Sequence, residues 1–102
     1  MTTAPTDHDL EQTMLALLAE RGPGKSICPS EVPRKLLGET GPWRGQLKRV
    51  RSLAGRLAES GRVVVLRHGK PVTGEGIRGV VRLAQGPAFT STDDPASPID
   101  GN

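Results

Sequence analysis

The sequence of 102 residues predicts a single α+β domain. Three segments repeat apolar residues at the spacing of one helical face, which is the pattern of amphipathic helices. Short runs of β-branched residues accompany them, and the clearest run is Val63–Leu66. A chain of this length has room for one hydrophobic core but not for two. We therefore expect three helices and a few strands around one core.

Charge and composition divide the chain into a basic centre and two acidic ends. All 14 Lys and Arg residues lie between Leu10 and Gln85. The same segment contains six Glu residues and no Asp, so its net charge is +8. Residues 86–102 are rich in Pro, Gly, Ser, Thr and Asp and lack apolar periodicity, which is typical of disorder. We predict a flexible N-terminus at 1–6, a folded domain at 7–85 and a disordered tail at 86–102.

The first helix is predicted over Asp7–Glu20. Thr6 followed by Asp9 fits a capping box, in which each residue satisfies a free backbone N–H group of the other. The expected core face consists of Leu10, Met14, Leu17 and Leu18. Glycine and proline at positions 22–24 end the helix, and a short extended stretch follows at Lys25–Cys28.

The second helix is predicted over Glu31–Leu37, with Ser30 as its N-cap. Pro33 fixes this start, because a proline costs little in the first turn, where backbone N–H groups have no partner within the helix. Gly38 ends the helix. The residues expected to point inward are Val32, Leu36 and Leu37.

A third and longer helix is predicted from Pro42 to Gly61, since proline is favoured at the first helical position. Its apolar face is expected to contain Trp43, Leu47, Val50, Ala54 and Leu57. Two strands follow, at Val63–Leu66 and Val80–Leu83. The segment His68–Gly79 between them is too rich in Gly and Pro for another helix, so we predict a hairpin loop.

The order of these elements is helix, short strand, helix, helix, strand, loop, strand. This is the order of a winged helix, a helix-turn-helix variant in which a hairpin, the wing, flanks the third helix. The segments ICPSEV and GKPV resemble those of a family of small bacterial proteins of unknown function with a winged-helix-like fold, over Leu10–Leu83. The resemblance implies the fold and no activity, because that family has no established substrate or catalytic residue. Pro33 departs from the family pattern, in which a good helix former such as Ala is expected.

Cations gather on the predicted third helix and in the wing. From Arg44 to Arg56 there are five positive charges and no acid, so ion pairs within the helix cannot balance them. One stripe consists of Arg44, Lys48 and Arg51, and a second of Arg49 and Arg56. The candidate nucleic-acid-binding residues are Arg44, Lys48, Arg49, Arg51, Arg56, Arg67, Lys70 and Arg78.

These cations are open to two interpretations, a solvated surface or an interface for nucleic acid. In a winged helix the third helix enters the major groove, which favours the second. The chain has no Tyr and only two other aromatic residues, Phe89 and Trp43, and Trp43 is expected in the core, so it lacks an aromatic platform for stacking single-stranded bases. We predict a module that binds duplex DNA, a small transcriptional regulator or a nucleoid-associated accessory protein. The alternative is a winged helix that binds a protein partner or forms a homodimer, without nucleic acid.

No catalytic, cofactor or metal site is predicted. Gly24–Ser26 imitates the end of a phosphate-binding loop, but Ala19 stands where that motif needs a glycine. Cys28 has no His or acid spaced to activate it. His8 and His68 have no partners at metal-ligand spacing. We therefore expect a protein that is not an enzyme.

Nothing in the sequence predicts contact with a membrane. No apolar run approaches the roughly 18 residues of a membrane span. The N-terminal stretch MTTAPTDHDLEQ lacks the basic and apolar regions of a signal peptide. We expect a cytoplasmic protein.

Overall fold

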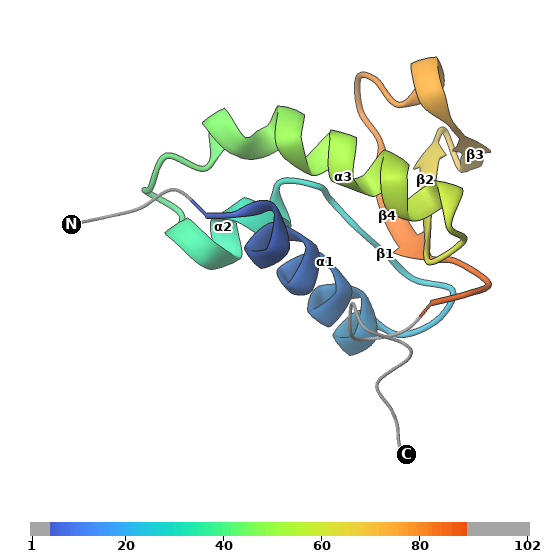
Figure 1. Cartoon of the computed structure of the whole chain (residues 1–102), viewed down its shortest axis with the longest axis horizontal. Helices are drawn as coiled ribbons and strands as arrows, with labels where there is room; N and C mark the ends of the chain where they lie inside the picture. The colour runs from blue at the N-terminus through green and yellow to red at the C-terminus, as the bar shows by residue number, and fades with distance from the viewer. Residues whose placement is uncertain (1–4, 90–102) are drawn as a thin grey trace.

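Helices and strands lie side by side as two parts of one domain (Figure 1). The computed structural model describes residues 5–89. Within them, three α-helices pack with a four-stranded antiparallel sheet, and their apolar residues form one continuous core. The predicted α+β class is confirmed.

Helix α1 spans Asp7–Arg21 and begins with the predicted capping box. The N–H of Asp9 donates to Thr6 Oγ1 at 3.0 Å, and the N–H of Thr6 donates to Asp9 Oδ2 at 3.0 Å. The fully buried residues are Leu10, Met14, Leu15 and Leu18. Leu15 thus belongs to the core, whereas Leu17 is only partly buried. Because α2, α3 and the sheet all contact α1, its buried face is wider than the predicted stripe.

Helix α2 spans Glu31–Leu37, as predicted, with Pro33 buried in its first turn. The expected side-chain cap by Ser30 is absent. The first N–H groups of the helix donate instead to carbonyls of the preceding turn, Glu31 to Cys28 at 2.9 Å and Val32 to Pro29 at 3.2 Å. Glu31 Oε2 accepts the N–H of Cys28 at 2.8 Å. The start of the helix is therefore held by these bonds, and the carboxylate inside its first turn also suits the helix dipole.

Helix α3 spans Leu47–Glu59 and is shorter than predicted, with a 3-10 helix at Arg44–Gln46 before it. Trp43 lies before both helices. Its ring N–H donates to the carbonyl oxygen of Glu39 at 2.9 Å, and this bond holds Trp43 near the end of α2. The core face of α3 consists of Val50, Leu53, Ala54 and Leu57. Two residues predicted in the core are only partly buried, Trp43 and Leu47.

The sheet has the strand order β1-β4-β2-β3, and every neighbouring pair is antiparallel. The strands are β1 (Ser26–Ile27), β2 (Val63–Arg67), β3 (Lys70–Val72) and β4 (Arg82–Gln85). Val65 pairs with Leu83, and both side chains are buried. At the β1 edge, the carbonyl oxygen of Ser26 accepts bonds from Arg21 at 2.9 Å and from Arg82 at 3.0 Å.

The segment predicted as a simple hairpin loop contains strand β3 and a 3-10 helix, Gly74–Gly76. Strands β2 and β3 are joined by His68 and Gly69, with φ angles of 55° and 79°, the conformation of a two-residue hairpin turn. Pro71 pairs with Leu66 at the edge of the sheet, where its missing N–H interrupts no ladder between strands.

The last strand begins later than predicted. The sequence placed it at Val80–Leu83, whereas β4 begins at Arg82 and continues to Gln85. Val81 and Leu83 are buried, and Val80 is 87% exposed. Side chains alternate along an extended chain, so an apolar run of this kind cannot be buried at every position of a sheet with one solvated face.

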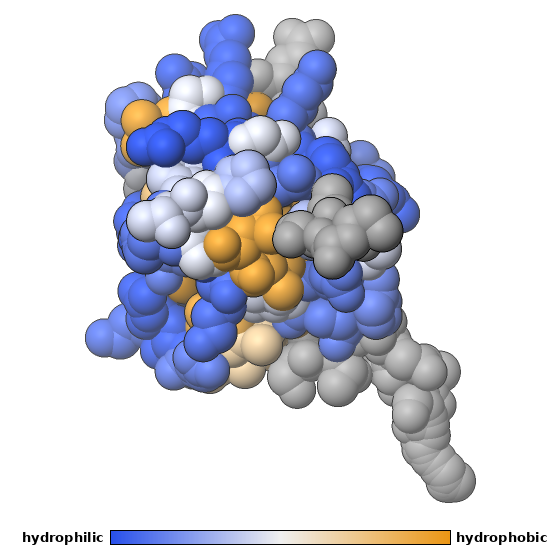
Figure 2. Space-filling view, turned by 90° about the vertical axis from the view of Figure 1, so that its left-hand side faces the viewer, coloured by the Kyte–Doolittle hydropathy of each residue, from blue (hydrophilic) through white to orange (hydrophobic). Residues whose placement is uncertain are grey.

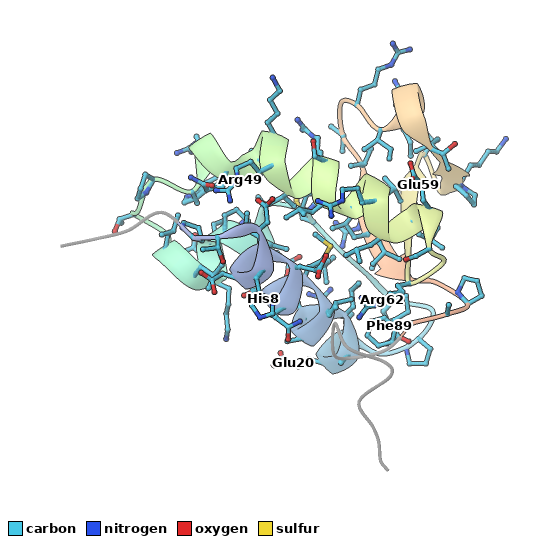
Figure 3. The ribbon with its side chains drawn as sticks, viewed as in Figure 1. His8, Glu20, Arg49, Glu59, Arg62 and Phe89 are labelled. Carbon is cyan, nitrogen blue, oxygen red and sulfur yellow. The ribbon has the colours of Figure 1, made fainter. Side chains whose placement is uncertain are left out.

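The ordered chain extends past both predicted boundaries of the domain. Pro5 is buried before α1, within the segment predicted as flexible. After β4, the N–H of Gly86 donates to the carbonyl of Arg62 at 3.0 Å, and Phe89 packs against the core. Figure 3 labels Phe89 near the described end of the chain. The rest of the two predicted flexible segments, 1–4 and 90–102, lies outside the described residues.

Residues 86–89 should therefore stabilise the domain. A chain that ends at Gln85 loses the bond from Gly86 and the ring of Phe89. Its thermal midpoint should lie about 4–8 °C below that of a chain ending at Phe89, corresponding to about 1 kcal/mol. Circular dichroism during heating measures both midpoints. Equal midpoints would show that this segment adds nothing to the core.

Candidate nucleic-acid interface

Helix α3 turns one polar face away from the core. Opposite its buried residues Val50 and Leu53 lie the exposed residues Lys48, Ser52 and Glu59. Glu59, labelled in Figure 3, is the one acid of this helix and lies at its C-terminal end. The charge of the exposed face therefore changes from positive to negative along the helix.

A loop at positions 73–81 covers the C-terminal half of this face. Ile77 contacts α3 at Gly55, where an added Cβ would lie 3.4 Å from Ile77 Cδ1. Arg51 Nη2 donates to the carbonyl oxygen of Gly79 at 3.3 Å. The loop is therefore fixed to α3 at two points, and the N-terminal half of the helix stays open.

The contact between Ile77 and α3 was not predicted from the sequence, although the glycine at position 55 could have indicated it. Gly55 stands inside a long helical pattern, where glycine costs about 1 kcal/mol relative to alanine. Such a residue needs a packing reason. The loop packs on the helix at this glycine, where an added Cβ would be in ordinary van der Waals contact with Ile77.

The 3-10 helix before α3, the open half of α3 and the loop together form a surface that we name the basic face. It consists of Arg44, Lys48, Arg51 and Arg78. The ion pairs and hydrogen bonds within residues 5–89 give none of these four a carboxylate partner. The Nε–H of Arg51 is buried and has no hydrogen-bond partner among the same residues. Because a surface ligand does not reach this buried N–H, the side chains of the basic face that are open to an anion are those of Arg44, Lys48 and Arg78.

Arg49, predicted as a nucleic-acid contact, is engaged within the fold. It projects from α3 toward the start of α1 (Figure 3). Its guanidinium donates to Asp7 Oδ1 at 2.7 Å, to the carbonyl of Pro5 at 2.9 Å and to Gln46 Oε1 at 2.7 Å. These bonds tie α3 to α1 and remove Arg49 from the basic face.

The other predicted cations lie to the sides of the basic face. Arg56 is exposed on the side of α3 that carries Arg49, where it lines a hollow of about 280 Å³ with Asp7 and with Lys48 of the basic face. Arg67 and Lys70 pair across the turn between β2 and β3. The eight predicted residues therefore do not form one patch.

Trp43 lies between two guanidinium groups instead of in the core. The Cζ atoms of Arg44 and Arg34 lie 4.4 Å and 5.6 Å from its ring centre, within the range of cation–π contacts. Arg34 also donates to Glu39 Oε2 at 2.9 Å, and this hydrogen bond raises the pKa of the Arg34 guanidinium above its ordinary value. Cation–π contacts and the hydrogen bond between Arg34 and Glu39 thus hold the connection from α2 to α3.

Removing the Trp43 ring should cost less than removing a core tryptophan. Trp43→Ala is expected to lower the free energy of unfolding by about 1–2 kcal/mol, because it loses two partly solvated cation–π contacts and one hydrogen bond. Urea denaturation measures the change, with Trp43→Phe as the variant that keeps an aromatic ring. A loss of about 3–5 kcal/mol would instead mean that the ring belongs to the core.

A second surface feature is apolar. Figure 2 faces the end of the molecule with α2 and the start of α3 and shows an apolar area among hydrophilic residues. A hollow of about 450 Å³ between α1 and α2 is lined by Leu17, Leu36 and charged residues of both signs. Leu36 is 39% exposed and Leu37 only partly buried, although both were predicted to point inward. The short α2 buries only Val32 and Pro33.

Within residues 5–89, no helix has both the length and the apolar composition to span a membrane. The same residues bring together no three His, Cys, Asp or Glu side chains that could hold a metal ion. Residues 7–86 match the model of a protein family of unknown function, DUF3253. A comparison with curated proteins finds no match.

Proposed function

The chain belongs to the DUF3253 family, whose function is unknown, and we propose that it is a winged-helix module that binds duplex DNA. In this proposal α3 lies in the major groove and the chain between β2 and β4 is the wing on the DNA backbone. The observation that carries the proposal is the basic face, whose four cations have no carboxylate partners among residues 5–89. A small regulator or a nucleoid-associated accessory protein is the kind of protein that would use such a module.

The arrangement of the elements supports this proposal. Strand β1 is antiparallel to β4, so the end of β1 and the beginning of β4 lie at the same end of the sheet. Helix α2 follows β1 there, and the loop that reaches Arg51 precedes β4. The start of α2, the loop and the open half of α3 therefore share one side of the molecule.

The position of the charges on α3 also supports an anionic partner. The first turn of α3 contains cations and no acid. Because the helix dipole makes this end positive, Lys48, which unlike Arg49 has no carboxylate partner among residues 5–89, costs about 0.3–1 kcal/mol at low ionic strength. A polyanion would reverse that cost.

Fluorescence anisotropy of a labelled duplex of mixed sequence, across a series of salt concentrations, tests the proposal. We expect binding whose log affinity falls linearly with log salt, by about 0.9 for each phosphate that the protein neutralises. Failure to bind with micromolar protein at about 50 mM salt would overturn the proposal, since phosphate contacts are strongest at low salt. Binding that does not depend on salt would also contradict it.

A protein partner is the second candidate, and the apolar hollow between α1 and α2 favours it. Leu17 of α1 and Leu36 of α2 line this hollow, and none of the residues of the basic face does. An apolar contact of this kind would not weaken steeply with salt, and its formation would carry a negative heat-capacity change. Isothermal titration calorimetry with a partner separates it from phosphate binding.

A further inference from the structure

An apolar hollow lies next to the basic face. It has a volume of about 210 Å³ and opens between α3, the loop before β4 and the segment before α2. Its apolar lining consists of Pro29, Leu47, Val80 and Val81, and Arg51 forms part of its wall. Lys48 is one helical turn from Arg51, and Arg78 is two positions from Val80. Of the basic face, Arg51 lines this small apolar site, and Lys48 and Arg78 are close along the chain to residues that line it.

Val80 is held at the rim of this hollow by anchors on both sides. Its side chain is 87% exposed, while the next residue, Val81, is 3% exposed and part of the core. On the other side, the carbonyl of Gly79 accepts the bond from Arg51, and Ile77 rests on α3. Because these neighbours are fixed, Val80 cannot turn inward without releasing the loop.

The exposure of a single valine needs no explanation, but Val80 is exposed at the rim of an apolar hollow. Single exposed apolar residues are common on protein surfaces. Val80, however, adds its methyl groups to a hollow already lined by Leu47 and Pro29. An apolar group of a ligand would be in contact with several side chains at once, and the guanidinium of Arg51 beside them would attract an anion.

We propose that this hollow receives the 5-methyl group of a thymine when α3 lies in the major groove. The inference rests on the proposed duplex binding. The thymine methyl is the apolar group that a duplex exposes in the major groove, and phosphates flank every base. The guanidinium of Arg51 in the wall of the hollow favours such a polyanion over an apolar segment of a protein. The site would give the protein a preference for thymine next to the contacts made by Arg51.

Duplexes that differ only in this methyl group test the proposal. One is rich in A·T pairs, and the other has the same sequence with deoxyuridine in place of every thymidine. The wild type should bind the thymine duplex about threefold to fivefold more tightly for each methyl group that enters the hollow. Val80→Ala should lose most of this preference and keep the salt dependence, because it changes no charge.

Leu36→Ala is the matched control, since Leu36 is the other large apolar residue exposed within residues 5–89 and lies on α2 beside a different hollow. It should keep both the thymine preference and the salt dependence. Equal affinity of the wild type for the two duplexes, with a steep salt dependence, would overturn the thymine site and leave duplex binding intact. A preference that persists in Val80→Ala would also overturn it. Failure to bind either duplex would overturn this site together with the proposed function.

Discussion

Replacing both Lys48 and Arg78 with alanine should weaken duplex binding on the order of tenfold or more at low salt. Both side chains are exposed on the basic face and have no partner within residues 5–89, so their removal should leave the fold intact. The slope of log affinity against log salt should shrink by about 0.9 for each phosphate that the variant no longer neutralises, which is up to about 1.8 for the pair. Anisotropy titrations at several salt concentrations give both quantities.

The control replaces two exposed lysines elsewhere, Lys25 before β1 and Lys35 on α2. This double variant has the same net charge as the first, so a general loss of attraction would affect both equally. We expect the control to keep the wild-type slope. A comparable loss of affinity in Arg56→Ala alone would move the interface toward the hollow that Arg56 and Lys48 line together, away from Arg78.

Leu15→Ala should cost about 2–5 kcal/mol of unfolding free energy, the largest stability effect that we predict. Leu15 is fully buried in α1, on the part of its face that the apolar periodicity did not include. The substitution leaves a cavity among α1 and its neighbours, because close-packed side chains relax only in part. Urea denaturation with an unchanged m-value would measure the loss.

Leu17→Ala makes the same chemical change two positions away on the same helix. Leu17 is only partly buried, so we expect a loss of about 1 kcal/mol. The comparison cancels helix propensity, which is the same in both variants. Equal losses, or a larger loss for Leu17, would support the core face with Leu17 that the sequence predicts. They would contradict the observed packing of α1, in which Leu15 is buried.

Sequence patterns predicted those parts of the fold that depend on local interactions. The capping box of Thr6 and Asp9 spans three positions, and the position of Pro33 is fixed by the geometry of one helical turn. Both features are visible in any short window of the sequence. They gave the correct start of α1 and the correct bounds of α2.

Features that depend on distant partners could not be predicted in this way. Arg49 is paired with Asp7, 42 positions away, and the sequence shows only a cation on a basic helix. Trp43 fits the apolar periodicity of α3, but two guanidinium groups cover its ring instead of the core. Strand β3 depends on His68 adopting a positive φ, a conformation that non-glycine residues rarely adopt. Helical spacing therefore grouped Arg44, Lys48 and Arg51, but it could not show that Arg78 belongs with them or that Arg49 is engaged elsewhere.

The two edges of the sheet also bear on how the protein behaves at high concentration. An exposed edge strand is a template on which a second chain can add, and such addition leads to fibrils. At one edge, Pro71 in the middle of the short strand β3 offers no N–H to an incoming strand. At the other, β1 has two residues, and Arg21 and Arg82 already occupy the carbonyl of Ser26. Neither edge presents a row of free donors and acceptors, so lateral growth of the sheet between molecules is blocked in the folded state.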